Sequence, residues 1–459
     1  MKENFSDYGL TEDILDALKL LNYKEPTQIQ REVIPYMIAG KNVVAKAQTG
    51  SGKTAAFAIP ICDKVKWEEN APQALILEPT RELSAQVQDD FFYIGRKKRL
   101  KVAALFGGFP IDKQIQTLKQ KTHIVTGTPG RVMDHIRRES LKLCQITHLV
   151  IDEADLMLDM GFIDEMKEIL ALLPSECRIS LFSATMGEEI KRLVDGRIEN
   201  AVFITQEEEK ETENKIVQKL YAVNEEQKFR DFVNVLIEEN PEKCMIFCDT
   251  REMVNVLFQK MRRSRIFCGM LHGEMEQRER LKTMNAFRRG GFRFLIATDV
   301  AARGIDLEGI THVMNYDFPT GKETYVHRIG RTGRNGASGV AISLVCEDDF
   351  RMLDMVRHFT KWELPVEACP QRDIGKEKIF WNTQRQKAVE NPTKGQALNQ
   401  GILRLSIGGG KKSKMRAGDI VGTICSIEDI RVEDIGIIDI RDSKSYVEIL
   451  NHKGSRVLE

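Results

Sequence analysis

The sequence lacks the features of a membrane, secreted or disulfide-bonded protein. No apolar run reaches the roughly 18 residues that a membrane-spanning helix needs, and the N-terminal MKENFSDYGLTEDIL contains acids in place of an apolar signal core. The nine cysteines are odd in number, scattered, and without a matching set of CxxC pairs, which favours reduced thiols over disulfides or zinc. We therefore expect a cytoplasmic protein without a membrane segment.

The chain also lacks an excess of charge of either sign. Its 68 lysines and arginines balance 68 aspartates and glutamates, so any basic surface for nucleic acid must be local. Hydrophobic residues make up 42% and charged residues 30%, as in an ordinary soluble protein. The 459 residues are enough for two or three domains, each with its own core.

The first informative segment that is present is AQTGSGKT, a phosphate-binding loop between a strand-like run and a helical pattern. Glycines let the backbone N–H groups point inward, and the start of the following helix adds positive potential. Lys53 is expected to reach the β- and γ-phosphates of a nucleotide, and the Thr54 hydroxyl is expected to bind Mg²⁺. The predicted nucleotide-binding residues of this loop are Ala47 (where a glycine is usual), Gln48, Thr49, Gly50, Ser51, Gly52, Lys53 and Thr54.

The second informative segment, DEAD at residues 152–155, supplies the metal ligand and the catalytic carboxylate. It follows a buried-strand pattern at residues 148–151, so its acids emerge at the carboxyl end of a strand, where open α/β sheets bind ligands. Asp152 is expected to hold Mg²⁺, partly through water, and Glu153 to polarise the attacking water. A glycine-rich turn or a solvated acidic turn would account for either segment alone. Together and in this order they indicate a nucleoside triphosphatase.

Helix and strand patterns alternate from about residue 10 to 365, which predicts an α/β fold with doubly wound parallel sheets. A charged run without apolar periodicity interrupts the alternation and predicts a linker at residues 207–215 between domains 1–206 and 216–367. The second half has no phosphate loop of its own, so we expect the nucleotide in a cleft between the two domains.

What the second half contributes is arginine. HRIGRTGR, residues 327–334, contains three arginines and two glycines. A guanidinium is permanently charged and binds phosphate oxygens in pairs, so Arg331 and Arg334 are expected to complete the catalytic site at the γ-phosphate. A basic surface loop is the alternative interpretation.

The chain resembles the DEAD-box RNA helicases over about residues 5–365. The segments that carry the resemblance are Phe5 with YKEPTQIQ (23–30), PTREL (79–83), GG (107–108), TPGR (128–131), SAT (183–185), FCDT (247–250), HG (272–273), ATD (297–299) and RGID (303–306). The resemblance implies two RecA-like domains in tandem and an ATP-dependent RNA helicase that unwinds short duplexes with RNA-stimulated ATP hydrolysis. Glu78, before PTREL, departs from the family pattern and is expected to face away from the RNA.

The resemblance also implies roles for individual residues. Phe5, Tyr23 and Gln30 are expected to bind adenine and Asp306 the ribose. His327 is expected to link the ATP and RNA sites, and Ser183, Thr185 and Asp155 to couple them. The expected RNA contacts of the core are Thr80, Arg81, Gly107, Gly108, Thr128, Pro129, Gly130, Arg131, Gly273 and Thr298. Many of these are small or hydroxylated residues at strand–helix junctions, where N–H groups and hydroxyls approach phosphates and the 2′-OH. Each of them alone would as readily be a helix cap or a turn glycine.

Residues 401–459 carry a second resemblance, to the C-terminal RNA-binding module of DbpA/YxiN-type helicases, a variant of the RNA-recognition fold. The pattern reads strand, basic glycine loop, helix, strand, strand and the start of a helix at Gly454. Because the chain stops at Glu459, before a second helix and a fourth strand are complete, we expect a truncated module. The third strand offers only Tyr446 for stacking, so the expected RNA contacts are Lys411, Lys412, Lys414 and Arg416. A solvated loop is the alternative.

The tail resemblance implies large-subunit (23S) ribosomal RNA or pre-ribosomal particles as partners in ribosome assembly, with no stable protein partner. Residues 368–400, polar and mostly unpatterned, are expected to form a flexible linker. Two other functions stay open at this point: an RNA clamp that uses ATP to grip without unwinding, and a helicase that acts on DNA.

Overall fold

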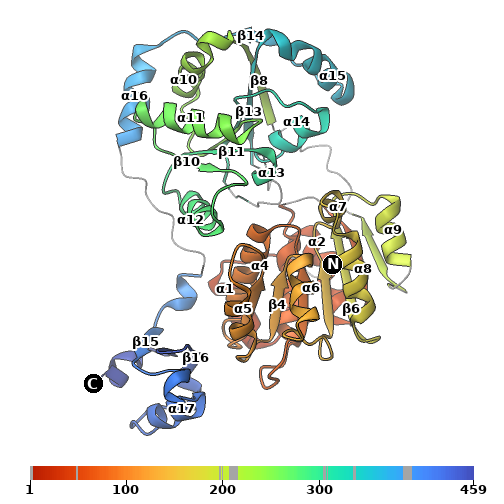
Figure 1. Cartoon of the computed structure of the whole chain (residues 1–459), viewed down its shortest axis with the longest axis vertical. Coiled ribbons are helices and arrows are strands. Elements are labelled where there is room, and N and C mark those ends of the chain that lie inside the picture. The colour runs from red at the N-terminus through yellow and green to blue at the C-terminus, as the bar shows by residue number, and fades with distance from the viewer. Residues whose placement is uncertain are drawn as a thin grey trace. The chain divides into compact units, whose positions relative to one another are not determined.

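A computed structural model describes residues 4–47, 50–195, 198, 200–205, 216–302, 307, 309–333, 337–385 and 395–458 (Figure 1). These residues form three sheets and group into two compact units, one of residues 1–206 with 393–459 and one of residues 207–392. No helix of this described part is long and apolar enough to cross a membrane. The predicted linker at 207–215 lies outside the described residues.

The first sheet has seven parallel strands in the order β3-β4-β2-β5-β6-β1-β7. Its strands are β1 (Val43–Lys46), β2 (Ala74–Leu77), β3 (Val102–Leu105), β4 (Ile124–Gly127), β5 (His148–Ile151), β6 (Arg178–Ser183) and β7 (Val202–Thr205). The helices of this domain are η1 (Phe5–Tyr8), α1 (Glu12–Leu20), α2 (Gln28–Ile38), α3 (Lys53–Lys64), α4 (Arg81–Ile94), α5 (Ile111–Leu118), α6 (Pro129–Arg137), α7 (Ala154–Asp159), α8 (Ile163–Leu172) and α9 (Glu188–Asp195).

Both faces of this sheet are buried, as its apolar strands require. Along β1, Val43 and Ala45 belong to one hydrophobic cluster and Val44 to another, because successive side chains of a strand point to opposite faces. A parallel sheet covered by helices on both faces reads as continuous apolar runs, which is how these strands were predicted.

The second sheet repeats the topology of the first, strand for strand, in the order β10-β11-β9-β12-β13-β8-β14. Its parallel strands are β8 (Ile216–Ala222), β9 (Cys244–Phe247), β10 (Cys268–Leu271), β11 (Phe294–Ala297), β12 (His312–Asn315), β13 (Gly339–Val345) and β14 (Val366–Ala368). Its helices are α10 (Lys228–Glu239), α11 (Arg251–Arg263), α12 (Gln277–Arg288), α13 (Asp299–Ala302), α14 (Lys322–Ile329), α15 (Phe350–Thr360) and α16 (Ile374–Arg385). The predicted pair of doubly wound domains is thereby confirmed.

The third sheet is small and antiparallel, in the order β15-β17-β16. Its elements are β15 (Leu403–Ile407), α17 (Ala417–Cys425), β16 (Ile435–Ile440), β17 (Ser445–Ile449) and α18 (Gly454–Leu458). Isoleucines of α17 and valine and isoleucine of β17 share one buried cluster, so the module has a core of its own. The predicted order of elements, ending in a helix at Gly454, is confirmed.

The predicted flexible linker at 368–400 is wrong in its first half, because it contains helix α16. Phe380 of α16 is fully buried, with its ring 6.3 Å from that of Phe294 in β11, and the helix also contacts α10. Phe380 and its neighbour Trp381 are the aromatic residues of the described part of this helix, and most of its other residues are polar. Two adjacent aromatic residues are too few to establish a helical period in the sequence.

Replacing Phe380 by alanine should lower the free energy of unfolding of the second domain by about 3–5 kcal/mol, because it removes a fully buried ring. Ile379→Ala is the matched control, since its side chain is 59% exposed on the same helix, and it should cost less than about 0.5 kcal/mol. Urea unfolding followed by tryptophan fluorescence measures both. Equal effects of the two substitutions would contradict the packing of α16.

Candidate active site

The phosphate-loop segment joins β1 to α3, and its backbone needs the glycines that the sequence has there. Gly50 and Gly52 adopt φ angles of 86° and 93°, in the left-handed region that favours glycine. A Cβ on Gly52 would lie only 2.6 Å from the side-chain nitrogen of Gln30. Ala47 follows β1 and donates its N–H to the Ser183 carbonyl at 3.0 Å. Gln48 and Thr49 lie outside the described residues.

Lys53, the first residue of α3, makes the central contact of the site. Its buried Nζ donates to Glu153 Oε1 at 2.7 Å and lies 3.9 Å from Asp152 Oδ1. Burial lowers the pKa of Lys53, but the Glu153 and Asp152 carboxylates raise it more, so the side chain stays charged. Burial raises the pKa of Asp152 to about 7 against the attraction of Lys53. The structure thus brings the phosphate-loop lysine and both predicted catalytic acids together.

Glu153 is held in an unusual backbone conformation at the start of α7. Its φ of 49° and ψ of 51° lie in the left-handed region, where a residue with a side chain is uncommon. Its N–H donates to Asp152 Oδ1 at 3.0 Å, which ties the two acids to each other. Strain of this kind persists where the surrounding structure requires a fixed side-chain direction, and it is common at active sites.

Two of the residues predicted to couple the ATP and RNA sites, Thr185 and Asp155, contact each other. Thr185, just after β6, donates its N–H and its hydroxyl to Asp155 Oδ2 at 2.9 Å and 3.2 Å. The neighbouring strand β5 leads into the Asp155 segment, so the contact joins the carboxyl ends of two adjacent strands. Ser183 is fully buried at the end of β6.

The predicted adenine-binding residues lie next to the phosphate loop, with their polar atoms already engaged. The Phe5 and Tyr23 rings meet edge to face at 6.2 Å. Gln30 Oε1 accepts from the Thr27 N–H at 3.0 Å, and its Nε2 donates to the Gly52 carbonyl at 3.1 Å. In this structure Gln30 therefore braces the loop, and binding a base through the same amide would require it to exchange these partners.

The predicted RNA contacts of the first domain gather at the carboxyl ends of three neighbouring strands, β3, β4 and β2. Thr80 follows β2 and caps α4 by accepting from the Leu83 N–H at 3.2 Å. Thr128 follows β4 and precedes α6, which begins with Pro129. These N-termini present backbone N–H groups at the same sheet edge, as a phosphate backbone requires.

Among the other predicted RNA contacts of this domain, some have open space around them and others already contact protein groups. A Cβ on Gly130 would meet nothing within 4 Å, whereas one on Gly107 would lie 3.1 Å from a guanidinium nitrogen of Arg81. Gly108, with a φ of 85°, forms a turn. Arg131 donates to the Phe109 carbonyl at 3.1 Å and to Gln114, so it supports the neighbouring loop.

In the second domain, the predicted RNA contacts again lie at neighbouring strand ends. Gly273 follows β10, and Thr298 follows β11 and caps α13 by accepting from the Ala301 N–H at 3.4 Å. His327 is exposed near the end of α14, and the partly exposed Arg331 follows it. Asp306 and Arg334 lie outside the described residues.

Three family models match the chain: DEAD/DEAH box helicase at residues 27–193, helicase conserved C-terminal domain at 227–336, and DbpA RNA binding domain at 404–459. The chain is 47% identical to the ATP-dependent RNA helicase DbpA of Bacillus subtilis over 99% of this chain and 96% of that protein. The chain belongs to the DEAD-box RNA helicase family. The prediction of an RNA helicase that uses ATP is confirmed.

Other relatives agree with this assignment. The DEAD-box ATP-dependent RNA helicase CshA of Bacillus licheniformis is 39% identical, over 81% of this chain and 77% of that protein. Among solved structures, Saccharomyces cerevisiae Dbp5 bound to RNA and ADP BeF3 matches with a TM-score of 0.71 and 31% identity, over 84% of this chain and all of that chain. The parallel-sheet domains of the helicase are therefore RecA-like, as predicted.

The helicase contains an arginine whose role the sequence did not reveal. Arg328 is 1% exposed and donates to both Asp299 oxygens at 2.6 Å and to Asp249 Oδ1 at 2.7 Å. It also donates to the Asp317 carbonyl at 2.7 Å, so it joins segments that follow β9, β11 and β12. The HRIGRTGR segment contributes this structural arginine as well as the two predicted catalytic ones. The two aspartates in the FCDT and ATD segments, Asp249 and Asp299, were the residues from which a buried arginine partner could have been inferred.

Glu78, the departure from the family pattern, is buried inside the first domain of the helicase. It is 0% exposed, and neither carboxylate oxygen has a hydrogen-bond partner among the described residues. It continues β2 beside Asp152, since Leu77 pairs with Ile151 in the neighbouring strand. Burial, and then the nearby Asp152 and Glu153 carboxylates, raise the pKa of Glu78 well above its usual range.

In the tail of the helicase, the predicted basic residues Lys411, Lys412, Lys414 and Arg416 are all exposed. Tyr446, the single stacking candidate, is flanked by two arginines that the sequence pattern did not place beside it. The Tyr446 ring lies 4.8 Å from the guanidinium carbon of Arg404 and 4.8 Å from that of Arg441. These arginines come from β15 and from the segment after β16, and their proximity depends on the antiparallel pairing of the strands.

Replacing Glu78 by glutamine should stabilise the first domain, and more so at higher pH. The folded pKa of Glu78 lies above its unfolded value, so the folded state holds a proton that the unfolded state has lost, and stability falls as pH rises above the unfolded pKa. Glutamine cannot ionise, so the variant should gain about 1 kcal/mol near pH 8 and little near pH 5. Urea unfolding at both pH values measures the difference. A gain independent of pH would contradict the assignment, and Glu12→Gln, at an exposed acid, is the control.

Proposed function

We propose that this helicase hydrolyses ATP with Mg²⁺, that RNA stimulates the hydrolysis, and that the enzyme separates short RNA duplexes. The observation that carries the proposal is the buried contact between Lys53 Nζ and Glu153 Oε1 at 2.7 Å, beside Asp152, at the end of a phosphate loop. A site with an ammonium, a loop of N–H groups and a carboxylate for water contains what hydrolysis of a phosphoanhydride requires.

Each group has one task in this proposal. Lys53 and the loop N–H groups bind the β- and γ-phosphates, and Glu153 accepts a proton from the attacking water and orients it. Arg331 and Arg334 stabilise the negative charge that develops on the γ-phosphate oxygens. Phe5, Tyr23 and Gln30 bind the adenine, and Asp306 binds the ribose.

The residues also fit a divalent metal. Asp152 is a carboxylate whose pKa is raised chiefly by burial, and then by the neighbouring Glu153 carboxylate, and such a group favours a nearby cation. Thr54, next to Lys53, and Asp152 would hold Mg²⁺, Asp152 partly through water. When bound, the ion would neutralise charge on the phosphates.

Coupling to RNA is proposed to run through the Asp155–Thr185 contact and His327. Both Thr185 hydrogen bonds end on one carboxylate oxygen, so a shift of the acidic segment moves the segment after β6 with it. RNA that favours the hydrolysis-competent conformation then increases turnover by shifting the population toward it.

We further propose that the RNA partner is large-subunit (23S) ribosomal RNA or a pre-ribosomal particle, met in the cytoplasm during ribosome assembly. The match of residues 404–459 to the DbpA RNA binding domain supports this proposal, as does the exposed basic cluster of the tail. No stable protein partner is needed for it.

Glu153→Gln should lower the rate of ATP hydrolysis at least about a hundredfold, because it removes the group that accepts the proton from water and keeps the side-chain volume. ATP binding should persist, since Lys53 and the loop are unchanged. Steady-state hydrolysis with saturating RNA, together with fluorescent nucleotide binding, measures both effects. Glu12→Gln is the control at an exposed acid. Turnover close to the parent rate would disprove the assignment of Glu153.

Changing Lys411, Lys412, Lys414 and Arg416 together to alanine should weaken binding to a ribosomal RNA hairpin. The dependence of log affinity on log salt should flatten by about one unit for each phosphate contact that is lost. ATP hydrolysis with saturating unstructured RNA should stay near the parent rate, which serves as the control. If the parent itself binds a ribosomal and a scrambled hairpin equally, the proposed target is wrong.

A further inference from the structure

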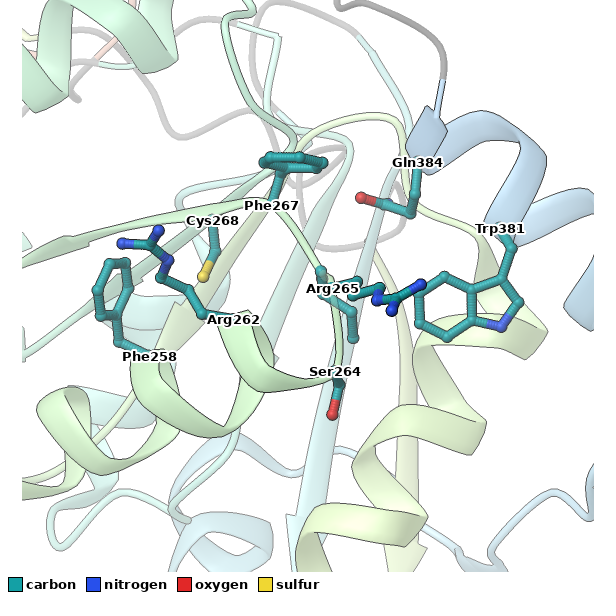
Figure 2. Close-up of a pocket in the computed structure, with 9 residues that line it drawn as sticks. Phe258, Arg262, Ser264, Arg265, Phe267, Cys268, Trp381 and Gln384 are labelled. Atoms are coloured by element: carbon teal, nitrogen blue, oxygen red, sulfur yellow. The ribbon is translucent and has the colours of Figure 1, made fainter.

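The second domain contains a cavity of about 720 Å³ between the end of α11, the start of β10 and helix α16 (Figure 2). Gly273, the predicted RNA contact, follows the opposite end of β10, roughly 20 Å away at about 3.3 Å per residue. The cavity is therefore separate from the strand-end positions assigned to the core RNA site. Its volume lies in the range of pockets for nucleotide-sized ligands.

The lining combines flat aromatic surfaces with guanidinium groups. Phe258, Phe267 and Trp381 provide the rings, and Phe267 is 69% exposed, which is costly for so large an apolar side chain. Arg262 and Arg265 provide the charge, and none of the nine lining residues has a carboxylate. Figure 2 shows Arg265 extending toward the Trp381 indole. A ligand that suits this lining is flat, aromatic and anionic.

The side-chain amide of Gln384 in α16 is a further polar group at the cavity. The residue is only 7% exposed, and its Nε2 has no hydrogen-bond partner among the described residues. Its side chain lines the cavity and points toward it in Figure 2. A buried donor without a partner costs about 1–3 kcal/mol, and an acceptor on a ligand would remove that cost.

The surrounding sequence favours a polyanion. Residues 253–273 contain Lys260, Arg262, Arg263 and Arg265 and no aspartate or glutamate. All four side chains are exposed. In a chain of net charge zero, this is a local concentration of positive charge next to stacking surfaces, the combination that binds single-stranded nucleic acid.

We propose that this cavity binds one nucleotide of single-stranded RNA that extends beyond the stretch held by the core. The base stacks on the aromatic rings, the Gln384 amide donates to an acceptor on the edge of the base, and Arg262 and Arg265 bind the flanking phosphates. The site lengthens the RNA footprint of the second domain. It rests on the proposed function only in requiring that the helicase binds single-stranded RNA.

Two substitutions remove the ligand contacts with little risk to the fold. Arg265 has a φ of 61°, a conformation that glycine adopts more readily, so Arg265→Gly removes the guanidinium and relaxes the backbone. Phe267→Ala truncates a mostly exposed ring. The matched control is Phe350→Ala with Arg351→Ala, an exposed phenylalanine and arginine on α15.

The test uses the full chain, a non-hydrolysable ATP analogue, and two fluorescent oligouridines, one that fills only the core and one about three times as long. The Arg265→Gly/Phe267→Ala variant should bind the long RNA at least about fivefold more weakly, the size of one lost base stack, with a salt dependence flatter by about one unit. Its affinity for the short RNA, and both affinities of the control, should equal those of the parent. Gln384→Leu should also weaken the long RNA alone, without lowering the thermal unfolding temperature.

Crosslinking of a thiouridine-substituted long RNA should label Phe267 or Trp381 in the parent. Unchanged affinity for the long RNA, or equal loss for both RNAs, would overturn the proposal. So would uridine monophosphate binding to the cavity as tightly as the long RNA does, which would indicate a free-nucleotide site, or an acidic aromatic peptide displacing the long RNA from the labelled residues. RNA-stimulated ATP hydrolysis of the parent with the short RNA tests the proposed function separately.

Discussion

The nucleotide side of this helicase depends on one buried ammonium among several carboxyl groups. Lys53, Asp152, Glu153 and Glu78 lie at one edge of the first sheet with little access to water. Burial raises the pKa values of Glu78 and Asp152, and repulsion between neighbouring carboxylates, which the single cation only partly offsets, adds to the rise. Such a site favours additional positive charge near Asp152, and it holds Lys53 charged for a phosphate.

The second domain has the same strand order but a different electrostatic solution at the corresponding edge. Arg328 donates to the carboxylates of Asp249 and Asp299 and to a backbone carbonyl. A guanidinium does not lose its proton, and its planar donors bind both carboxylates, so each acid has a cationic partner although the two acids outnumber the one cation. The two sheet edges therefore differ in how their acids are paired, although the two domains share one strand order.

The surfaces of this chain that suit RNA phosphates are confined to short segments. With no net charge, the protein offers phosphates only short basic segments and helix N-termini. Residues 411–416 of the tail and 260–265 of the second domain, whose lysines and arginines are exposed, are two such segments. In the tail, Tyr446 lies beside Arg404 and Arg441, and in the second domain Phe267 lines the same cavity as Arg262 and Arg265.

Features that depend on neighbouring residues could be predicted from the linear pattern. A glycine loop before a helix, acids after a buried strand, and the alternation of strand and helix patterns are local, so Lys53, Asp152, Glu153 and both parallel sheets could be predicted. Tertiary structure alone decided what depends on distant segments meeting: the burial of Glu78 beside Asp152, the pairing of Arg328 with Asp249 and Asp299, and the bracing of Gly52 by Gln30. It also decided that α16 packs through Phe380 where a flexible linker was predicted. Burial and partner choice are properties of the assembled core, and a linear pattern does not carry them.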